Sequence, residues 1–132
     1  METLTITSDP QNIAQVEAFV EDIRAKFNIG DEAYGNILIS LTEAANNAII
    51  HGNGCDVTKM ATITADLDTK RKSVVFTITD QGKGFDHSTL PDPTAPENVD
   101  QPNGRGVFLM MQLADMVVFS NHGSTVEMQF RV

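Results

Sequence analysis

The sequence predicts a single α+β domain, a two-layer sandwich in which a mixed, mainly antiparallel sheet carries helices on one face. The chain has 132 residues, of which 41% are hydrophobic, so it can bury one core. Short segments of alternating polarity indicate strands, and longer segments with apolar residues every three or four positions indicate helices. Because strands and helices do not alternate strictly, an antiparallel sheet is favoured over a doubly wound parallel one.

The N-terminal elements are a strand, two helices and a hairpin. Residues 3–7 alternate and are rich in Thr and Ile, which is typical of a strand. An Asp-Pro pair then begins a helix over residues 10–27, and a second helix extends over residues 31–52, where a Gly-Asn-Gly sequence breaks it. Two strands follow at 60–67 and 73–79, and the polar residues between them predict a hairpin turn.

The C-terminal elements begin with a long loop. Residues 86–103 contain four prolines and few apolar residues, so they predict a loop of the kind that often serves as a lid over a site. A third helix is expected over residues 105–115. The last two strands are expected at 116–121 and 125–131, and all of these elements form one domain over residues 1–132.

Composition excludes several classes of protein. Nine Lys and Arg against eighteen Asp and Glu give a net charge of −9, so neither nucleic acid nor an anionic membrane is an expected direct partner. The longest apolar segment, residues 107–111, is far shorter than the ~20 residues that span a bilayer. The N-terminus shows no signal-peptide pattern, and the single cysteine, Cys55, cannot form an internal disulfide. We therefore expect a cytoplasmic protein.

A polar stripe on the second helix is the first candidate for function. Ser40, Glu43, Asn47 and His51 follow one another at steps of three and four residues. A solvated helix face would show the same pattern. The functional alternative is a carboxylate that accepts a proton beside an amide oxygen that ligates a hard cation, since Glu43 and Asn47 are one turn apart.

Two glycine-containing segments are the other candidates. In residues 80–85, Asp80 ends a predicted strand and can accept a hydrogen bond from a ligand, while the glycines permit close approach of backbone. In residues 104–109, glycines at a helix start present free N–H groups to phosphate, and Arg105 adds a charge. Each segment alone is also compatible with an ordinary turn. Neither forms a P-loop or a dinucleotide-binding fingerprint.

Together the three segments resemble the GHKL ATPase superfamily, whose fold is the Bergerat fold. The segment Glu43–Gly52 looks like its N box, Asp80–Phe85 like its G1 box, Gly104–Gly106 like its G2 box, and Gly123–Thr125 like its final Gly-Thr element. Order and spacing agree over roughly residues 37–132. Within the superfamily the chain most resembles the bacterial anti-sigma factor serine/threonine kinases, because sensor histidine kinases usually carry Asn in place of Glu43.

This resemblance implies a site for ATP and Mg²⁺. Asp80 would accept the adenine amino group with support from Thr125, and the backbone of Gly82 and Gly84 would pack against adenine and ribose. Asn47 would ligate Mg²⁺. The phosphates would be held by the glycine-containing segment at the predicted start of the third helix, through Gly104, Arg105, Gly106 and Val107.

The resemblance also implies an activity and partners. Glu43 would act as general base toward a hydroxyl group of the protein substrate, and the role of His51 stays open between the site and a helix cap. The kinase would phosphorylate a small anti-anti-sigma antagonist and, in another state, would sequester a sigma factor. Family members are often dimers, which leaves a homodimer open. The alternatives are a nucleotide-gated binding module with little or no transfer, and a bare ATPase domain that serves another assembly.

Overall fold

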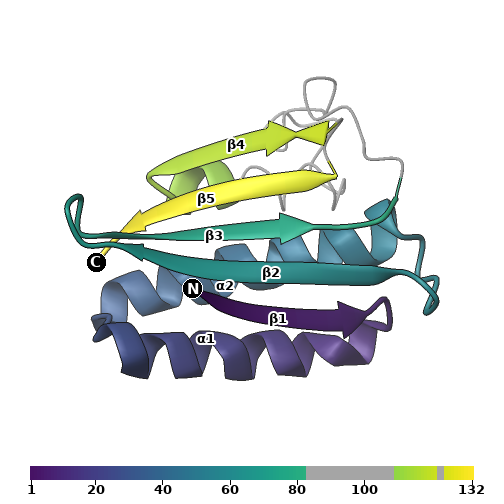
Figure 1. Cartoon of the computed structure of the whole chain (residues 1–132), viewed down its shortest axis with the longest axis horizontal. Coiled ribbons are helices and arrows are strands. Elements are labelled where there is room, and N and C mark those ends of the chain that lie inside the picture. The colour runs from purple at the N-terminus through teal and green to yellow at the C-terminus, as the bar shows by residue number, and fades with distance from the viewer. Residues whose placement is uncertain (83–108, 122–123) are drawn as a thin grey trace, which may run out of the picture.

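The described part of the chain folds into one sheet with helices against it (Figure 1). The computed structural model describes residues 1–82, 109–121 and 124–132. Residues 109–113 are helical. The other elements, in chain order, are β1 (Glu2–Thr7), the 3₁₀ turn η1 (Pro10–Asn12), α1 (Ile13–Phe27), α2 (Asp31–Asn46), the π-helical turn η2 (Asn47–Gly52), β2 (Met60–Asp68), β3 (Ser73–Thr79), β4 (Met116–Ser120) and β5 (Thr125–Arg131).

The sheet has five strands in the order β1-β2-β3-β5-β4. Every described ladder between neighbouring strands is antiparallel. The α+β prediction is therefore confirmed, and the parallel pairing that it allowed does not occur among the described strands. The last strand, β5, lies between β3 and β4, so β3 and the C-terminal strands form one continuous surface.

The two faces of the sheet differ in polarity, which explains the two layers. On one face Ile63, Ile78 and Val126 lie in register on β2, β3 and β5 and are buried. On the other face Thr62 and Thr79 are aligned in the neighbouring register and are not buried. The helices cover only the apolar face (Figure 1). Their buried apolar side chains are Val16, Val20 and Ile23 of α1, and Ile37, Leu41, Ala44 and Ala45 of α2.

The N-terminal helices begin and end where local signals predict. The Asp9 side chain accepts a hydrogen bond from the Gln11 N–H, and Pro10 occupies the first turn. At the other end Asn28 adopts the left-handed conformation with φ 54°, and its N–H donates to the Arg24 carbonyl. The Arg24 guanidinium also lies 4.3 Å from the centre of the Tyr34 ring, so it joins α1 to α2.

Some predictions fall on parts of the chain outside the described residues. The loop proposed as an ATP lid, residues 86–103, is one of them, and so is the start of the third helix, residues 105–108. Within the described ranges, no helix combines the length and the hydropathy that crossing a membrane requires.

Candidate functional site

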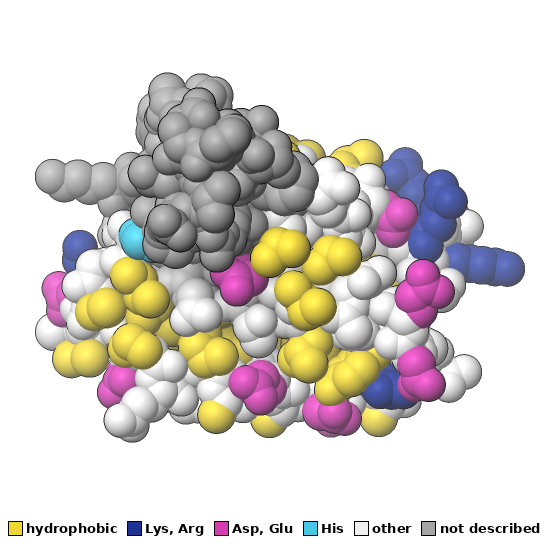
Figure 2. Space-filling view, turned by 180° about the vertical axis from the view of Figure 1, so that it is seen from behind, with side chains coloured by type: hydrophobic (Ala, Val, Ile, Leu, Met, Phe, Trp, Pro, Cys, Tyr) yellow, Lys and Arg dark blue, Asp and Glu magenta, His cyan; other side chains and the backbone are white. Residues whose placement is uncertain are grey.

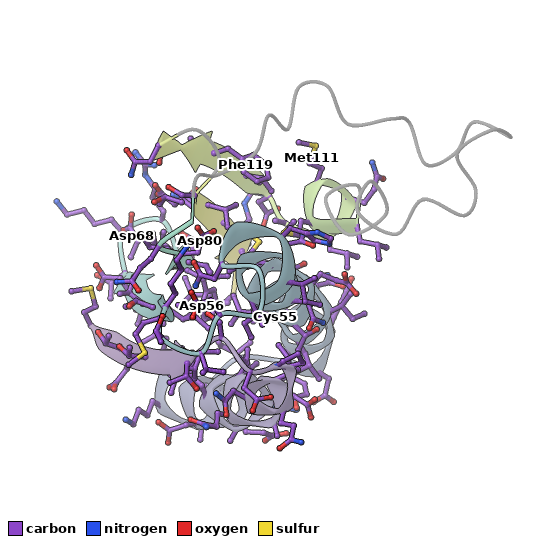
Figure 3. All side chains as sticks on the ribbon, turned by 90° about the vertical axis from the view of Figure 1, so that its right-hand side faces the viewer. Cys55, Asp56, Asp68, Asp80, Met111 and Phe119 are labelled. Atoms are coloured by element: carbon purple, nitrogen blue, oxygen red, sulfur yellow. The ribbon has the colours of Figure 1, made fainter. Side chains whose placement is uncertain are left out.

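A small pocket lies between the second helix and the C-terminal half of the sheet. Helix residues Ala44, Asn47 and Ala48 form one wall, and Met110 lies beside them. The remaining lining residues come from the sheet: Ile78, Phe119 and Val126 lie in strands, Asp80 follows β3 and Ser124 precedes β5. Figure 3 shows Asp80 below Phe119 at the end of the molecule where α2 stops. The cavity measures about 10 Å³, which is about the room of one water molecule.

Asp80 is the buried carboxylate of this pocket. It follows β3 directly, is 9% exposed, and its N–H donates to the Ser124 carbonyl at 2.9 Å. Burial raises the pKa of the Asp80 carboxyl, because the charged form loses solvation. The Gly82 N–H, which donates to Asp80 Oδ1 at 2.8 Å, and the charge of Lys59 partly oppose that rise in pKa. A buried carboxylate that faces an apolar pocket is therefore a strong acceptor for a ligand N–H group.

Two glycines hold the backbone of this site together by close approach. A Cβ atom on Gly82 would lie 1.6 Å from the Gly52 carbonyl oxygen. A Cβ atom on Gly52 would lie 2.3 Å from Asp80 Oδ2. Both distances are far below van der Waals contact, so only glycine fits at either position without a shift of the backbone or of Asp80. The end of η2 thus packs directly on the turn after β3.

We expect Gly82→Ala to lower the free energy of unfolding by about 1–3 kcal/mol, because the added methyl group meets backbone that cannot move aside cheaply. Urea unfolding measures this change. The matched control is Gly35→Ala in α2, where nothing lies within 4 Å of the added Cβ. The control is expected to gain about 0.5–1 kcal/mol from helix propensity. A Gly82→Ala protein as stable as wild type would contradict the close packing.

The helix that carries Glu43 and Asn47 changes its winding at the site. The predicted helix over 31–52 is an α-helix only to Asn46, and a π-helical turn continues it to Gly52. The Asn53 N–H donates to the Ala48 carbonyl at 2.8 Å, which closes a ring one residue larger than in an α-helix. π-helical turns occur often at functional sites. The prediction missed this turn because it depends on contacts made after Gly52.

Glu43 and Asn47 lie one turn apart along the second helix. The Asn47 N–H donates to the carbonyls of Glu43 and Ala44, so the α-helical spacing is kept up to this point. Asn47 lines the pocket, and both side chains are half-buried. Within the part of the chain that the structure describes, no hydrogen bond or ion pair holds either side chain.

The two ends of the predicted polar stripe, Ser40 and His51, are placed differently from Glu43 and Asn47. Ser40 is completely buried, and its Oγ has no hydrogen-bond partner among the described residues, so the stripe is not simply a solvated face. His51 is exposed in the last turn of η2. It does not line the pocket with Asn47 and Asp80.

The structure differs from the prediction at Thr125. Its hydroxyl contacts that of Thr79 at 3.4 Å, on the open face of the sheet and away from the pocket. The lining residue is instead Ser124, whose neighbour Val126 also faces the pocket. Strand residues alternate between faces, so Val126 pointing inward requires Thr125 to point outward.

Other predicted residues cannot be placed. Gly84 and the phosphate-binding group of Gly104, Arg105, Gly106 and Val107 lie outside the described residues. Conversely, the predictions named neither Met110 nor Phe119 as pocket residues, although both line it. Both side chains line the pocket because the tertiary structure places their helix or strand beside it. The local sequence around them therefore gave no sign of this role.

The residues that are placed fit an adenine ring and a hard cation. A purine is flat, largely apolar and carries an amino group, and here an apolar lining ends at the buried carboxylate of Asp80. The amide oxygen of Asn47 is of the kind that ligates Mg²⁺. Among the described residues no three His, Cys, Asp or Glu side chains gather as a metal site.

Comparison with known proteins agrees with this geometry. Residues 6–130 match a family model described as the histidine kinase-like ATPase domain. No curated protein was found to match the chain. The family model extends from the end of β1 into β5, so it includes the pocket and both glycine contacts.

Proposed function

Because the chain belongs to the family of histidine kinase-like ATPase domains, and so is an ATP-binding module of the GHKL type, we propose that it is a protein serine/threonine kinase and anti-sigma factor. In one state it sequesters a sigma factor. In another it transfers the γ-phosphoryl group of ATP to a serine or threonine of an anti-anti-sigma antagonist. The proposed place of action is the cytoplasm, where sigma factors work.

One observation carries the enzymatic part of the proposal. Asn47 and Asp80 are 33 positions apart in the chain, yet they line the same pocket, and Glu43 lies one helical turn before Asn47. A binding module needs the first two residues to hold the nucleotide. It has no use for a third residue, the half-buried carboxylate of Glu43, beside the proposed phosphate end of the site. The presence of Glu43 at that place therefore favours transfer over binding alone.

Each residue has a proposed role toward the substrate ATP. Asp80 accepts the adenine amino group, and Ser124, rather than Thr125, is the hydroxyl beside it. Asn47 would hold Mg²⁺, which would neutralise charge that develops on the phosphates during transfer. The phosphates are assigned to the segment that includes Arg105, on the resemblance of residues 104–107 to a G2 box.

Glu43 is proposed to take the proton in the transfer step. The hydroxyl oxygen of the substrate serine or threonine forms a bond to the γ-phosphorus while the bond to the β–γ bridging oxygen breaks. The hydroxyl proton passes to the Glu43 carboxylate, and ADP leaves with the electron pair of the broken bond. A positioned base of this kind contributes about 10²–10⁴-fold to rate.

Nucleotide entry is expected to open the pocket. The cavity has room for about one water molecule, so lining side chains would have to move for adenine to bind. Met110 is the best candidate to move, because methionine is unbranched and adapts its shape at low cost. It comes from the 109–113 helix, whereas the walls formed by Ile78 and Val126 belong to the sheet.

The helix side of the molecule offers a surface for protein partners. Figure 2 shows apolar side chains exposed among acidic ones on this side. Exposed apolar residues on these helices include Ile39 of α2, Ile50 of η2 and Met111 of the 109–113 helix. Apolar exposure of this kind is typical of protein-binding surfaces. The net charge of −9 favours a basic partner, such as a protein that also contacts DNA.

A phosphotransfer assay tests the proposal. The chain is incubated with γ-labelled ATP, Mg²⁺ and candidate antagonist domains encoded by neighbouring reading frames. Label on a serine or threonine of one antagonist, with release of a bound sigma factor, is the expected result. ATP-dependent partner binding without label would favour the nucleotide-gated binding module. ATP hydrolysis without label transfer and without partner binding would favour a bare ATPase domain.

A further inference from the structure

A buried asparagine joins separate segments next to the pocket. Asn53 is 3% exposed and follows η2 directly. Its Nδ2 donates to Ser8 Oγ at 2.8 Å and to the Met60 carbonyl at 3.0 Å, and its Oδ1 accepts from the Gln81 N–H at 2.8 Å. The amide thus bonds to the end of β1, the start of β2 and the turn after β3 in a single buried cluster.

The bond to Gln81 is the one that reaches the pocket. Gln81 lies between Asp80, the buried carboxylate, and Gly82, whose N–H donates to that carboxylate. A second bond secures the same turn, because the Met60 N–H donates to Gln81 Oε1 at 2.7 Å. The backbone that presents Asp80 is therefore held to Asn53 through its next residue.

Asn53 also fixes the end of the π-helical turn. Its N–H donates to the Ala48 carbonyl, and Ala48 lines the pocket. Gly52 precedes it and contacts both Asp80 and Gly82 at distances that leave no room for a side chain. The main chain of Asn53 thus bonds to the helical segment that carries Asn47, and the side chain of Asn53 bonds to the turn that carries Asp80.

We propose that Asn53 is a positioning residue of the nucleotide site, which sets the distance between the helix that carries Asn47 and the turn that carries Asp80. This inference rests on the proposed function, in which these two residues hold the two ends of one nucleotide. Asn53 does not touch the nucleotide. It acts through the Gln81 N–H and through the close contact of Gly52 with Gly82.

The principal test compares Asn53→Ala with Asn12→Ala. Asn12 is a matched control, because its Nδ2 also donates two hydrogen bonds, to the carbonyl and to Oγ1 of Thr7, and its Oδ1 also accepts one, from Gln15. It lies at the start of α1 and is not among the pocket residues. Both variants lose bonds that support the fold, so a change in stability alone does not separate them.

Two measurements do separate the variants, both under conditions where each protein is fully folded. The first is hydrogen exchange of the Gln81 amide without nucleotide, which is expected to be about tenfold faster in Asn53→Ala than in Asn12→Ala. The second is ATP affinity by calorimetry, which is expected to fall about tenfold in Asn53→Ala and to stay near wild type in Asn12→Ala. Equal exchange, or equal affinity, in the two variants would overturn the proposal.

A second variant keeps the test decisive if Asn53→Ala does not fold. Gln81→Ala removes the other bond that holds the turn, and the Gln81 side chain is exposed, so this variant should fold. It is expected to weaken ATP binding several-fold, and unchanged affinity would count against the proposal. If wild type itself binds no ATP, the proposed function fails and the role of Asn53 in nucleotide positioning fails with it. The exchange of Gln81 still decides whether Asn53 holds the turn.

Discussion

Replacing Glu43 by glutamine is expected to lower phosphoryl transfer to the antagonist about 10²–10⁴-fold, because glutamine keeps the size of glutamate but cannot accept a proton at neutral pH. ATP affinity should change little, since Asp80 and Asn47 supply the proposed contacts to the nucleotide. The Glu43→Gln protein should also retain sigma-factor binding but fail to release it. Single-turnover transfer from labelled ATP measures the rate, and calorimetry measures the affinity.

Glu32→Gln is the matched control for this prediction. Glu32 is an exposed carboxylate in the first turn of the same helix and does not line the pocket. Its replacement should leave transfer unchanged. If transfer by Glu43→Gln stays within about twofold of wild type, Glu43 is not the general base. The nucleotide-gated binding module would then be the better description of the protein.

Replacing Asp80 by asparagine is expected to have opposite effects on ATP affinity and on stability. The Gly82 N–H already holds Oδ1, so asparagine would place its amide nitrogen at the other position, where a donor cannot accept the adenine amino group. An unmet hydrogen bond of this kind costs about 1–3 kcal/mol, which corresponds to roughly 5–150-fold in affinity. Calorimetry with ATP measures the loss, and affinity equal to wild type would remove Asp80 from adenine recognition.

The stability effect follows from the raised pKa of Asp80. The folded state binds this proton more tightly than the unfolded state, whose carboxyl pKa is near 3.8. Wild type therefore loses stability as pH rises from about 3.8 through the raised folded pKa, and the loss is complete above it. Without nucleotide, Asp80→Asn should thus be more stable than wild type at pH 7. This advantage should shrink as pH falls through the same interval.

Asp56→Asn is the control, and it should show the opposite sign. Hydrogen bonds from the Thr58 hydroxyl and N–H lower the pKa of the exposed Asp56 carboxyl. Ionised Asp56 therefore stabilises the folded state above pH 3.8, and this contribution is lost as pH falls through the folded pKa. Asp56→Asn should be less stable at neutral pH with unchanged ATP affinity. Urea unfolding across pH measures both variants. If the stability of both variants relative to wild type changed with pH in the same direction, burial would not be the cause of the raised pKa of Asp80.

The sequence by itself determined the elements and the family. Strands at 60–67 and 73–79 were predicted from alternation, and the structure places them at Met60–Asp68 and Ser73–Thr79. The start of the first helix was readable from Asp9 and Pro10. These features depend on residues within one or two turns of each other, and local backbone preferences decide them. Motif order likewise indicated the ATP-binding family before any packing was known.

Only the tertiary structure decided how those segments meet at the site. The contact of Gly82 with Gly52 and the side-chain bonds of Asn53 to Ser8 and Gln81 join residues that are distant in sequence, and the burial of Asp80 depends on the same packing. The π-helical turn arises in the same place, at the end of a helix that local propensity would have kept α-helical. Such features follow from close packing and from the need to pair every buried polar group. Both are properties of the assembled core, so no single segment of the sequence encodes them.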